Sequence, residues 1–179
     1  IEKLVRHFGK TENKIQINNP NTGKLIYELP QLSAADVELA VVNARKAQPE
    51  WEATDISTRS GIMYRLHDLI LDRQDELMDI IQLETGKARA HAFEEIAGAL
   101  GAARYYAKIA KKALSPSKTV AGVPLLTKTW VNHIPVGVVG VITPWNYPLA
   151  LTALDVLPAL VAGNTVVQKP DNQTALIAL

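Results

Sequence analysis

Cysteine is absent from the 179-residue sequence. Its absence excludes a disulfide framework, a thiolate metal site and a thiol nucleophile supplied by these residues. An excess of one charge is also missing, because 19 lysines and arginines are balanced by 18 aspartates and glutamates. Nucleic-acid binding needs a concentrated cationic surface, so the composition argues against a nucleic-acid partner.

Long uninterrupted apolar runs are missing as well. The longest apolar stretch, residues 147–163, contains Asp155 and two prolines. It falls short of the roughly 20 residues that span a bilayer. Residues 1–10 mix charged and apolar side chains and do not resemble a secretory signal. We therefore expect no membrane segment, and the cytoplasm is the expected compartment.

The first part of the chain alternates apolar and polar residues on both sides of a turn. Residues 15–17 and 25–29 alternate, and residues 18–24 are rich in asparagine and also contain proline and glycine. Two alternating runs joined by turn formers predict a β-hairpin.

Three helices are predicted next. Ser33 and Asp36 form a capping-box pattern, and the helical spacing that follows is predicted to end at Pro49. Apolar residues from 56 to 70 mark a second helix, and a third is predicted to end at Thr85 and Gly86.

A longer helix is predicted over residues 87–114, which are rich in small side chains that would let another backbone approach closely. Lysines gather near its C-terminal end, where the helix dipole favours cations; a nucleotide or an acidic partner is the alternative interpretation. The predicted apolar face carries Phe93, Ile96, Leu100, Ala103, Ala107 and Ala110, and the lysines are Lys108, Lys111, Lys112 and Lys118.

Residues 136–142 form an unbroken, largely β-branched run that is too short for a helix. The run predicts a strand buried on both faces. Residues 148–162 have helical spacing, Gly163 and Asn164 supply a C-cap, and residues 165–168 predict a second buried strand. Strand, helix and strand in this order form a βαβ unit with parallel strands.

A two-stranded parallel sheet has no neighbouring strands that complete its edges, so this unit cannot stand alone. Residues 174–179 are predicted to begin a further amphipathic helix. We therefore expect the chain to be part of a larger α/β protein. Between the helices and the βαβ unit, residues 119–131 predict short β segments with a bend at 122–124.

Two polar clusters, residues 143–148 and 169–174, follow the predicted strands. Ligands of doubly wound sheets bind beyond the carboxyl ends of parallel strands, so both clusters are candidate site segments. Each is predicted to open a helix whose free backbone N–H groups can receive an anion.

Asn146 and Lys169 are the candidate functional side chains in these clusters. Asn146 either caps the following helix or donates to an oxygen that becomes negatively charged during a reaction. Lys169 is either a solvated cation or a ligand for ribose hydroxyls or a phosphate. Glycine-rich phosphate loops, a nucleophile elbow and a zinc-protease motif are absent, and the four histidines share no spacing that indicates a metal site.

The two clusters and their flanks closely resemble the NAD(P)-dependent aldehyde dehydrogenase superfamily. Three further motifs match the family in order and approximate spacing, so the resemblance covers nearly the whole chain. The matching segments are residues 135–148 (PVGVVGVITPWNYP), 158–160 (PAL), 163–170 (GNTVVQKP), 19–23 (NPNTG), 84–87 (ETGK) and 104–107 (RYYA).

In this family a cysteine attacks the aldehyde, the adduct passes hydride to the nicotinamide, and a glutamate activates the water that releases the acid. The resemblance implies that Asn146 is the oxyanion-hole asparagine and that Lys169 binds the adenosine ribose or its 2′-phosphate. It implies cofactor contacts for Ile142, Thr143, Pro144 and Trp145. The cysteine cannot come from these residues.

Many family members carry glutamate where this sequence has Asn172. A neutral amide does not repel a 2′-phosphate, so we predict that NADP is at least tolerated beside NAD. The neighbouring runs resemble those of NADP-dependent succinate-semialdehyde dehydrogenases. Some relatives have an arginine where Leu154 stands, so a substrate carboxylate would need a cation from another region.

The resemblance implies an α/β fold with three segments. Residues 1–117 are expected to form the hairpin and helices of a Rossmann-like cofactor-binding domain, residues 118–134 a β excursion that joins an oligomerisation sheet, and residues 135–179 the first βαβ unit. The implied activity is oxidation of an aldehyde, with succinate semialdehyde as the expected substrate, by a longer homo-oligomeric enzyme. A non-catalytic nucleotide-binding or assembly module is the alternative.

Overall fold

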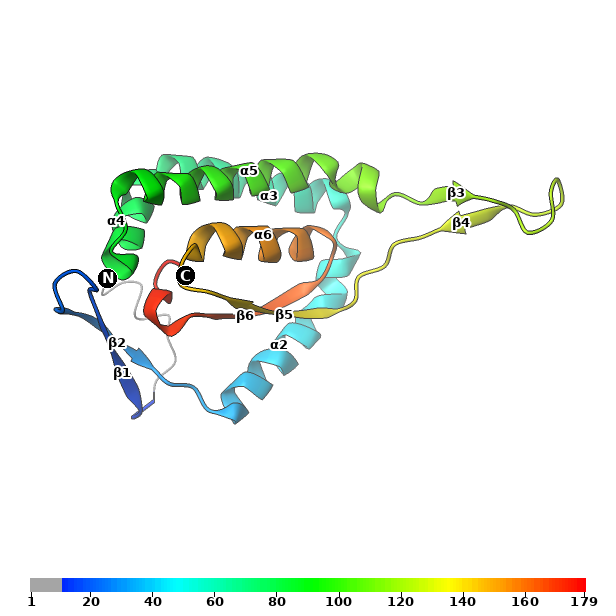
Figure 1. Ribbon diagram of the computed structural model, residues 1–179. Coiled ribbons are helices and arrows are strands. Elements are labelled where there is room, and N and C mark those ends of the chain that lie inside the picture. Colours follow the sequence, from blue (N-terminus) through cyan, green and yellow to red (C-terminus); the bar gives the residue numbers. More distant parts are fainter. Residues whose placement is uncertain (1–10) are drawn as a thin grey trace.

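The computed structural model describes residues 11–179, and the expectations for residues 1–10 lie outside this range. Its centre is a parallel pair of strands, β5 (Val138–Thr143) and β6 (Thr165–Pro170), joined by α6 (Pro148–Val161). Helix α6 covers one face of the pair and α2 (Ala34–Ala53) covers the other (Figure 1). The predicted βαβ unit and its parallel pairing are therefore confirmed.

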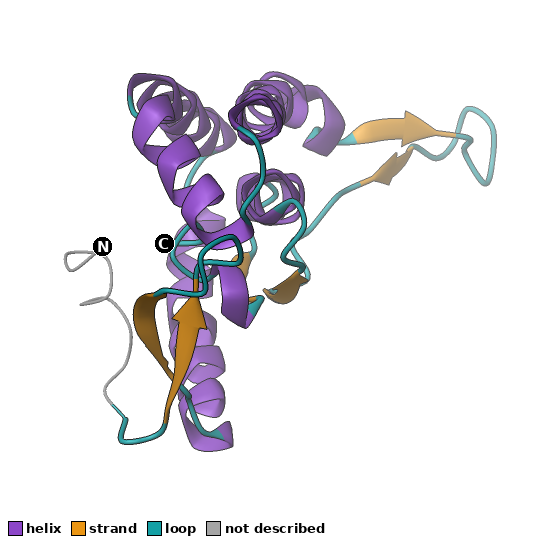
Figure 2. Cartoon of the chain, turned by 60° about the vertical axis from the view of Figure 1, so that its left-hand side comes forward, coloured by secondary structure: helices purple, strands orange, loops and turns teal. Residues whose placement is uncertain are grey.

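The predicted N-terminal hairpin is also confirmed. Strands β1 (Lys14–Asn18) and β2 (Leu25–Pro30) pair in antiparallel register. The hairpin stands at the front of Figure 2, beside the C-terminal segment. A small apolar core unites the two, because Ile17, Tyr27 and Leu29 are buried together with Ala175 and Leu176.

Helix α2 begins at the predicted capping box, since the Ser33 side chain accepts from the Asp36 N–H and the Asp36 carboxylate accepts from the Ser33 N–H. The predicted end at Pro49 is wrong, because the helix continues to Ala53. A proline inside a helix costs about 3 kcal/mol. Contacts of the final turn offset this cost: the Trp51 indole donates to the Leu160 carbonyl at 2.9 Å, and the buried Arg59 guanidinium donates to carbonyls of the same turn.

Three helices, α3 (Ile56–Asp72), α4 (Gln74–Thr85) and α5 (Arg89–Leu114), follow as predicted. The left-handed Gly86 ends α4, and α3, α5 and α6 enclose the main core. The prediction that Phe93 lies on the buried face is wrong, since its side chain is 53% exposed. The buried stripe passes through Ala92 and Ile96 instead, and the small Gly98 lets Ala150 of α6 approach closely.

Strand β5 begins later than predicted and is not buried on both faces. Val136 precedes the strand and is 84% exposed, and Ile142 within it is 80% exposed. Only one strand lies beside it in residues 11–179, so nothing in this part of the chain covers the outer edge. The predicted cap at Gly163 and Asn164 is confirmed, with Gly163 left-handed and the Asn164 side chain accepting from the Gly137 N–H at 3.0 Å.

The helix predicted over residues 174–179 does not form. A short 3-10 helix, η1 (Asn172–Thr174), is followed by turns. The backbone N–H groups of Leu176 and Ile177 donate to the Glu84 carboxylate, and both side chains are buried.

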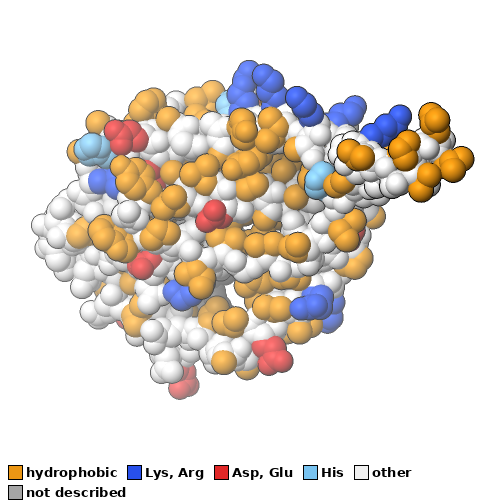
Figure 3. Space-filling view, turned by 45° about the vertical axis from the view of Figure 1, so that its right-hand side comes forward, with side chains coloured by type: hydrophobic (Ala, Val, Ile, Leu, Met, Phe, Trp, Pro, Cys, Tyr) orange, Lys and Arg blue, Asp and Glu red, His pale blue; other side chains and the backbone are white. Residues whose placement is uncertain are grey.

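The predicted β excursion is a narrow arm. Strands β3 (Ser117–Thr119) and β4 (Thr129–Val131) pair in antiparallel register, with the predicted bend at residues 122–123 between them, and project away from the body of the molecule (Figure 1). Hydrophobic side chains gather along the arm, and basic side chains lie beside its base (Figure 3). No helix within residues 11–179 is long and apolar enough to cross a membrane.

Candidate functional site at the carboxyl edge of the parallel strands

The two candidate clusters lie at the same edge of the parallel pair. Ile142 of β5 pairs with Lys169 of β6, and Thr143 pairs with Pro170, so both strands end side by side. Asn146 follows β5 by three residues, and both Asn146 and Lys169 are exposed to solvent. The geometry expected for a ligand-binding edge is therefore present, with an amide and an ammonium group on one rim.

The segment between β5 and α6 presents apolar surface at this rim. Ile142 is largely exposed, Trp145 is 59% exposed, and Pro144 is exposed between them. The Thr143 side chain differs, because it is buried and its hydroxyl faces the Thr152 hydroxyl of α6 at 3.5 Å. Thr143 as a whole residue is only 3% exposed, so the structure does not present it at the rim as it presents its neighbours.

Asn146 does not cap α6. The cap position is Tyr147, which makes no side-chain capping bond, so the capping interpretation of Asn146 is wrong. Within residues 11–179 the Asn146 side chain has no hydrogen-bond partner, while its backbone carbonyl accepts from the Lys87 ammonium at 2.7 Å. The amide of this side chain is therefore available to a ligand.

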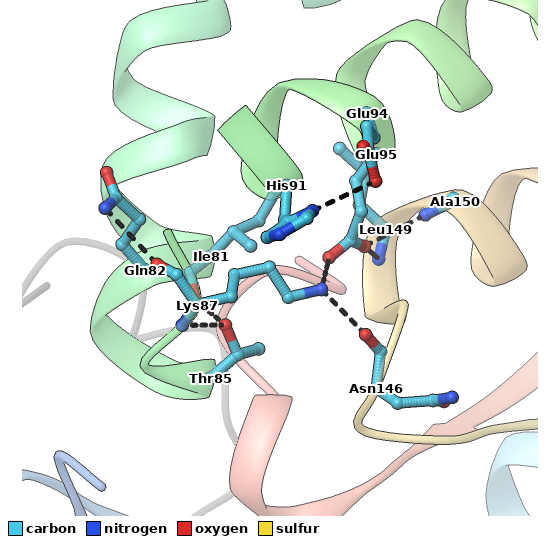
Figure 4. Close-up of polar contacts among 10 residues, drawn as sticks. All are labelled: Ile81, Gln82, Thr85, Lys87, His91, Glu94, Glu95, Asn146, Leu149 and Ala150. Carbon is cyan, nitrogen blue, oxygen red and sulfur yellow. Dashed lines mark hydrogen bonds and ion pairs between the residues drawn. The ribbon is translucent and has the colours of Figure 1, made fainter. Parts of the chain in front are cut away.

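The first turn of α6 is capped by a residue from another helix. Glu95 of α5 is fully buried, and one carboxylate oxygen accepts from the N–H groups of Leu149 at 2.9 Å and Ala150 at 3.4 Å (Figure 4). The expectation that these N–H groups are free to receive an anion is therefore wrong. The other carboxylate oxygen pairs with the Lys87 ammonium at 2.5 Å.

Lys87 and Glu95 were missed as site residues by reasoning from the sequence. Lys87 belongs to the ETGK motif, but nothing local shows what its side chain contacts. Glu95 gave a usable signal: it lies three residues after Ala92 and beside Ile96 on the buried stripe of α5. A carboxylate on a buried stripe needs a partner, which here is an ammonium and a helix terminus.

The second cluster holds the other predicted residues. The Lys169 ammonium lies 3.2 Å from the carbonyl oxygen of Pro170 and 3.4 Å from the side-chain oxygen of Asn172. Asn172 is exposed at the start of η1, and the Asp171 side chain accepts from the Gln173 N–H at 2.9 Å. The helix predicted to begin in this cluster is only the three-residue turn η1. One of its backbone N–H groups, that of Gln173, already donates to Asp171 and is not free for a ligand.

The buried carboxylate of Glu84 lies next to the second cluster and binds the backbone that follows it. Glu84 accepts from the Tyr27 hydroxyl at 2.7 Å and from the N–H groups of Leu176 at 2.9 Å and Ile177 at 3.1 Å. Burial raises the pKa of Glu84 and the hydrogen bonds lower it, so that the pKa lies at about 7. Burial also raises the pKa of the Tyr27 hydroxyl, and the neighbouring Glu84 charge raises it further.

The turn motifs of the sequence meet beside this carboxylate. The Asn19 side chain donates to the Leu83 carbonyl and the Asn21 side chain to the Gly86 carbonyl, both at 3.1 Å. Gly86 has a φ of 73°, and a Cβ there would lie 2.9 Å from the Asn21 side chain. The NPNTG and ETGK motifs therefore form one packed support behind the second cluster.

A shallow hollow of about 280 Å³ lies elsewhere, at the amino end of the strands. Glu52, Arg59, His133, Val136 and Asn164 are among the residues that line it. Ligands of doubly wound sheets bind at the opposite, carboxyl end. The hollow is therefore separate from the candidate site.

The arrangement defines the class: an α/β protein with a parallel βαβ unit and a candidate ligand site at its carboxyl edge. The model of the aldehyde dehydrogenase family matches residues 8–179. The chain belongs to the aldehyde dehydrogenase family, and this confirms the resemblance found in its motifs.

Individual relatives agree with this membership. A Mycolicibacterium smegmatis protein named "Putative succinate-semialdehyde dehydrogenase [NADP(+)]" is 49% identical over 158 residues, which are 88% of this chain and 31% of that protein. An aldehyde dehydrogenase from Brucella melitensis has a TM-score of 0.88 and 33% identity, covering 93% of this chain and 34% of its own. PnpE in complex with nicotinamide adenine dinucleotide has a TM-score of 0.86 and 34% identity, covering 92% and 34%. The chain thus spans about a third of the length of these relatives.

Proposed function

We propose that the protein containing this chain oxidises an aldehyde to its carboxylic acid and transfers hydride to NADP or NAD, with succinate semialdehyde as the substrate. The observation that carries the proposal is the shared rim, where the exposed Asn146 amide and the Lys169 ammonium follow two parallel strands. Family membership supplies the reaction class. The similarity to the M. smegmatis relative supports the substrate and the use of NADP.

Asn146 is the proposed donor to the oxyanion. When a nucleophile adds to an aldehyde, the carbonyl oxygen gains negative charge, and a fixed amide N–H stabilises that charge in the transition state. The Asn146 side chain is exposed and makes no hydrogen bond within residues 11–179, so its N–H is free for this role. These 179 residues contain no cysteine, so the nucleophile of the family belongs to another part of the protein.

The rim also fits a dinucleotide. When bound, the nicotinamide group accepts hydride from the substrate. Lys169 is exposed at the end of β6, where its ammonium can bind a ribose hydroxyl or a 2′-phosphate, and the neighbouring Asn172 adds a neutral amide. Ile142, Pro144 and Trp145 offer exposed apolar surface beside it. The site thus contains a cation for the phosphate of NADP and no carboxylate at position 172 that would repel it.

Leu154 bears on the substrate. It lies on α6, and its apolar side chain is partly exposed. A leucine cannot pair with the carboxylate of succinate semialdehyde, so the proposal requires that a cation for this group come from outside residues 11–179 or from another face of the site.

The projecting arm is the proposed site of self-association. Its exposed apolar side chains are Val120, Val123, Leu125, Leu126, Trp130 and Val131. Strands of three residues are too short to be stable alone, and exposed apolar surface of this kind marks an interaction site. We propose that a second copy of the protein covers it.

The test is an assay of the full-length protein with a panel of aldehydes and with NADP or NAD. We expect reduction of the cofactor with succinate semialdehyde, and we expect Asn146→Ala to lower kcat by about 100-fold with little change in KM. An unchanged kcat would remove Asn146 from the chemistry. Binding of NADP without turnover of any aldehyde would favour the non-catalytic nucleotide-binding module.

A further inference from the structure

The Lys87 ammonium contacts the Asn146 segment in two ways and also pairs with Glu95 of α5. It donates to the Asn146 carbonyl at 2.7 Å and pairs with Glu95 (Figure 4). It also lies 4.4 Å from the centre of the Tyr147 ring. Glu95 in turn accepts from the N–H groups of the first turn of α6. One ion pair therefore contacts the segment both before and after Tyr147.

This ion pair is shielded from water. Glu95 is 0% exposed and Lys87 only 14%, so water does not screen their attraction as it does at the surface. Both residues come from the α4–α5 region, which packs into the main core, whereas Asn146 lies in an exposed connection. The core of the molecule is thereby linked to the backbone of a residue whose side chain is free.

We propose that Lys87, fixed by Glu95, is a positioning residue that sets the direction of the Asn146 amide. The inference rests on the proposed function, because it assigns the lysine to the residue that is to stabilise the oxyanion. Lys87 acts through the backbone carbonyl of Asn146 and touches none of the reacting atoms. A hydrogen-bond donor contributes to catalysis only when its direction is fixed before the reaction.

A neighbouring residue provides a matched control. Arg89 lies two residues after Lys87 and joins α4 to α5 through Asp75 and Asp79, but it makes no contact with the Asn146 segment. Removing either side chain weakens the junction between α4 and α5. Only the loss of Lys87 should change the geometry of Asn146.

The experiment uses the full-length protein, a double variant and a control variant, and each variant is also combined with Asn146→Ala. Lys87→Met alone would leave the Glu95 charge buried and unpaired, which destabilises proteins strongly. The double variant Lys87→Met/Glu95→Gln removes both charges and keeps an oxygen that can accept from the Leu149 N–H, so it is designed to fold. Arg89→Met is the control. Each is measured for kcat and KM, alone and combined with Asn146→Ala, and the double variant is crystallised.

We expect the double variant to lower kcat by about 10- to 100-fold, with the KM for NADP within about twofold of the wild type. In the Asn146→Ala background it should cause no further loss, because both changes remove the same donor. Its crystal structure should show residues 145–147 displaced, and Arg89→Met should leave kcat unchanged.

Three results would overturn the inference: an unchanged kcat in the double variant, a loss that adds fully to that of Asn146→Ala, or a crystal structure in which residues 145–147 keep their place. If the wild-type protein oxidises no aldehyde, the proposed function fails. The crystal structure of the double variant then still decides whether Lys87 holds the segment.

Discussion

We predict that the choice between NADP and NAD depends on Asn172, the side chain beside Lys169. Asn172 is neutral, and its side-chain oxygen lies 3.4 Å from the Lys169 ammonium. The substitution Asn172→Glu places a carboxylate at this point, where it pairs with the lysine. A 2′-phosphate bound to the same ammonium would then lie roughly 4 Å from a second anion.

Coulomb's law gives the size of the effect. Two unit charges 4 Å apart interact by about 1 kcal/mol in bulk water and by about 4 kcal/mol at the effective dielectric constant of a protein surface. Because both side chains are exposed, we take a value of about 2 kcal/mol. This corresponds to about a 30-fold loss in kcat/KM for NADP, and no such loss is expected for NAD, which lacks the phosphate.

The assay is a comparison of kcat/KM for the two cofactors in the full-length wild type, Asn172→Glu and Asn172→Gln. The glutamine variant has the same length as glutamate without its charge, so it isolates the electrostatic contribution. The loss in Asn172→Glu should shrink as salt is added. Equal NADP-to-NAD ratios in the glutamate and glutamine variants would refute the reasoning.

Two further predictions concern stability and assembly. Burial raises the pKa of Glu84 from 4.5 to about 7, so between these pH values the Glu84 carboxyl binds a proton in the folded protein but not in the unfolded chain. Protonated Glu84 thereby adds about 3 kcal/mol to the free energy of unfolding. This contribution is complete below pH 4.5 and is lost as the pH rises to about 7. Thermal unfolding of wild type and Glu84→Gln across this range should therefore show the extra decline only in the wild type, and parallel curves would contradict it. Replacing the exposed Leu125 and Leu126 of the arm by aspartate should shift the full-length protein to smaller species in analytical ultracentrifugation, whereas an unchanged distribution would show that the arm is not the interface.

Local patterns were enough to predict most elements of the fold. Alternation on both sides of a turn gave the β1–β2 hairpin, and a β-branched run followed by helical spacing gave the parallel βαβ unit. The order of strands also placed Asn146 and Lys169 at one edge, because parallel strands end on the same side. These features depend on neighbours in the sequence and on general rules of chain connection.

The errors arose where distant contacts override local preference. Pro49 does not end α2, because the turn that follows it is anchored by Trp51, which donates to the Leu160 carbonyl of α6, and by Arg59 of α3, which donates to the Trp51 carbonyl. Residues 175–178 form turns where periodicity predicted a helix, and the N–H groups of Leu176 and Ile177 donate to Glu84, some 90 positions earlier. Periodicity carries no information about such partners.

The same limit explains the missed part of the site. The pairing of Lys87 with Glu95 involves the end of one helix and the interior of the next, and its contact with Asn146 spans 59 positions. Burial of a carboxylate was visible in the pattern of α5, but the identity of its partners was not. The sequence could therefore predict that Asn146 and Lys169 lie at one edge, but not the contacts that Lys87 and Glu95 make with the Asn146 segment.

The long-range bonds of Glu84 also bear on how the chain folds as it leaves the ribosome. The ETGK segment is synthesised roughly 90 residues before Leu176 and Ile177, whose backbone N–H groups donate hydrogen bonds to its glutamate, Glu84. Until they emerge, this carboxylate has only the Tyr27 hydroxyl among the partners described above, so we expect it to stay hydrated and the β1–β2 hairpin to remain loosely docked. During translation, the β1–β2 hairpin and Glu84 can therefore complete their contacts only after the segment that follows β6 has been synthesised.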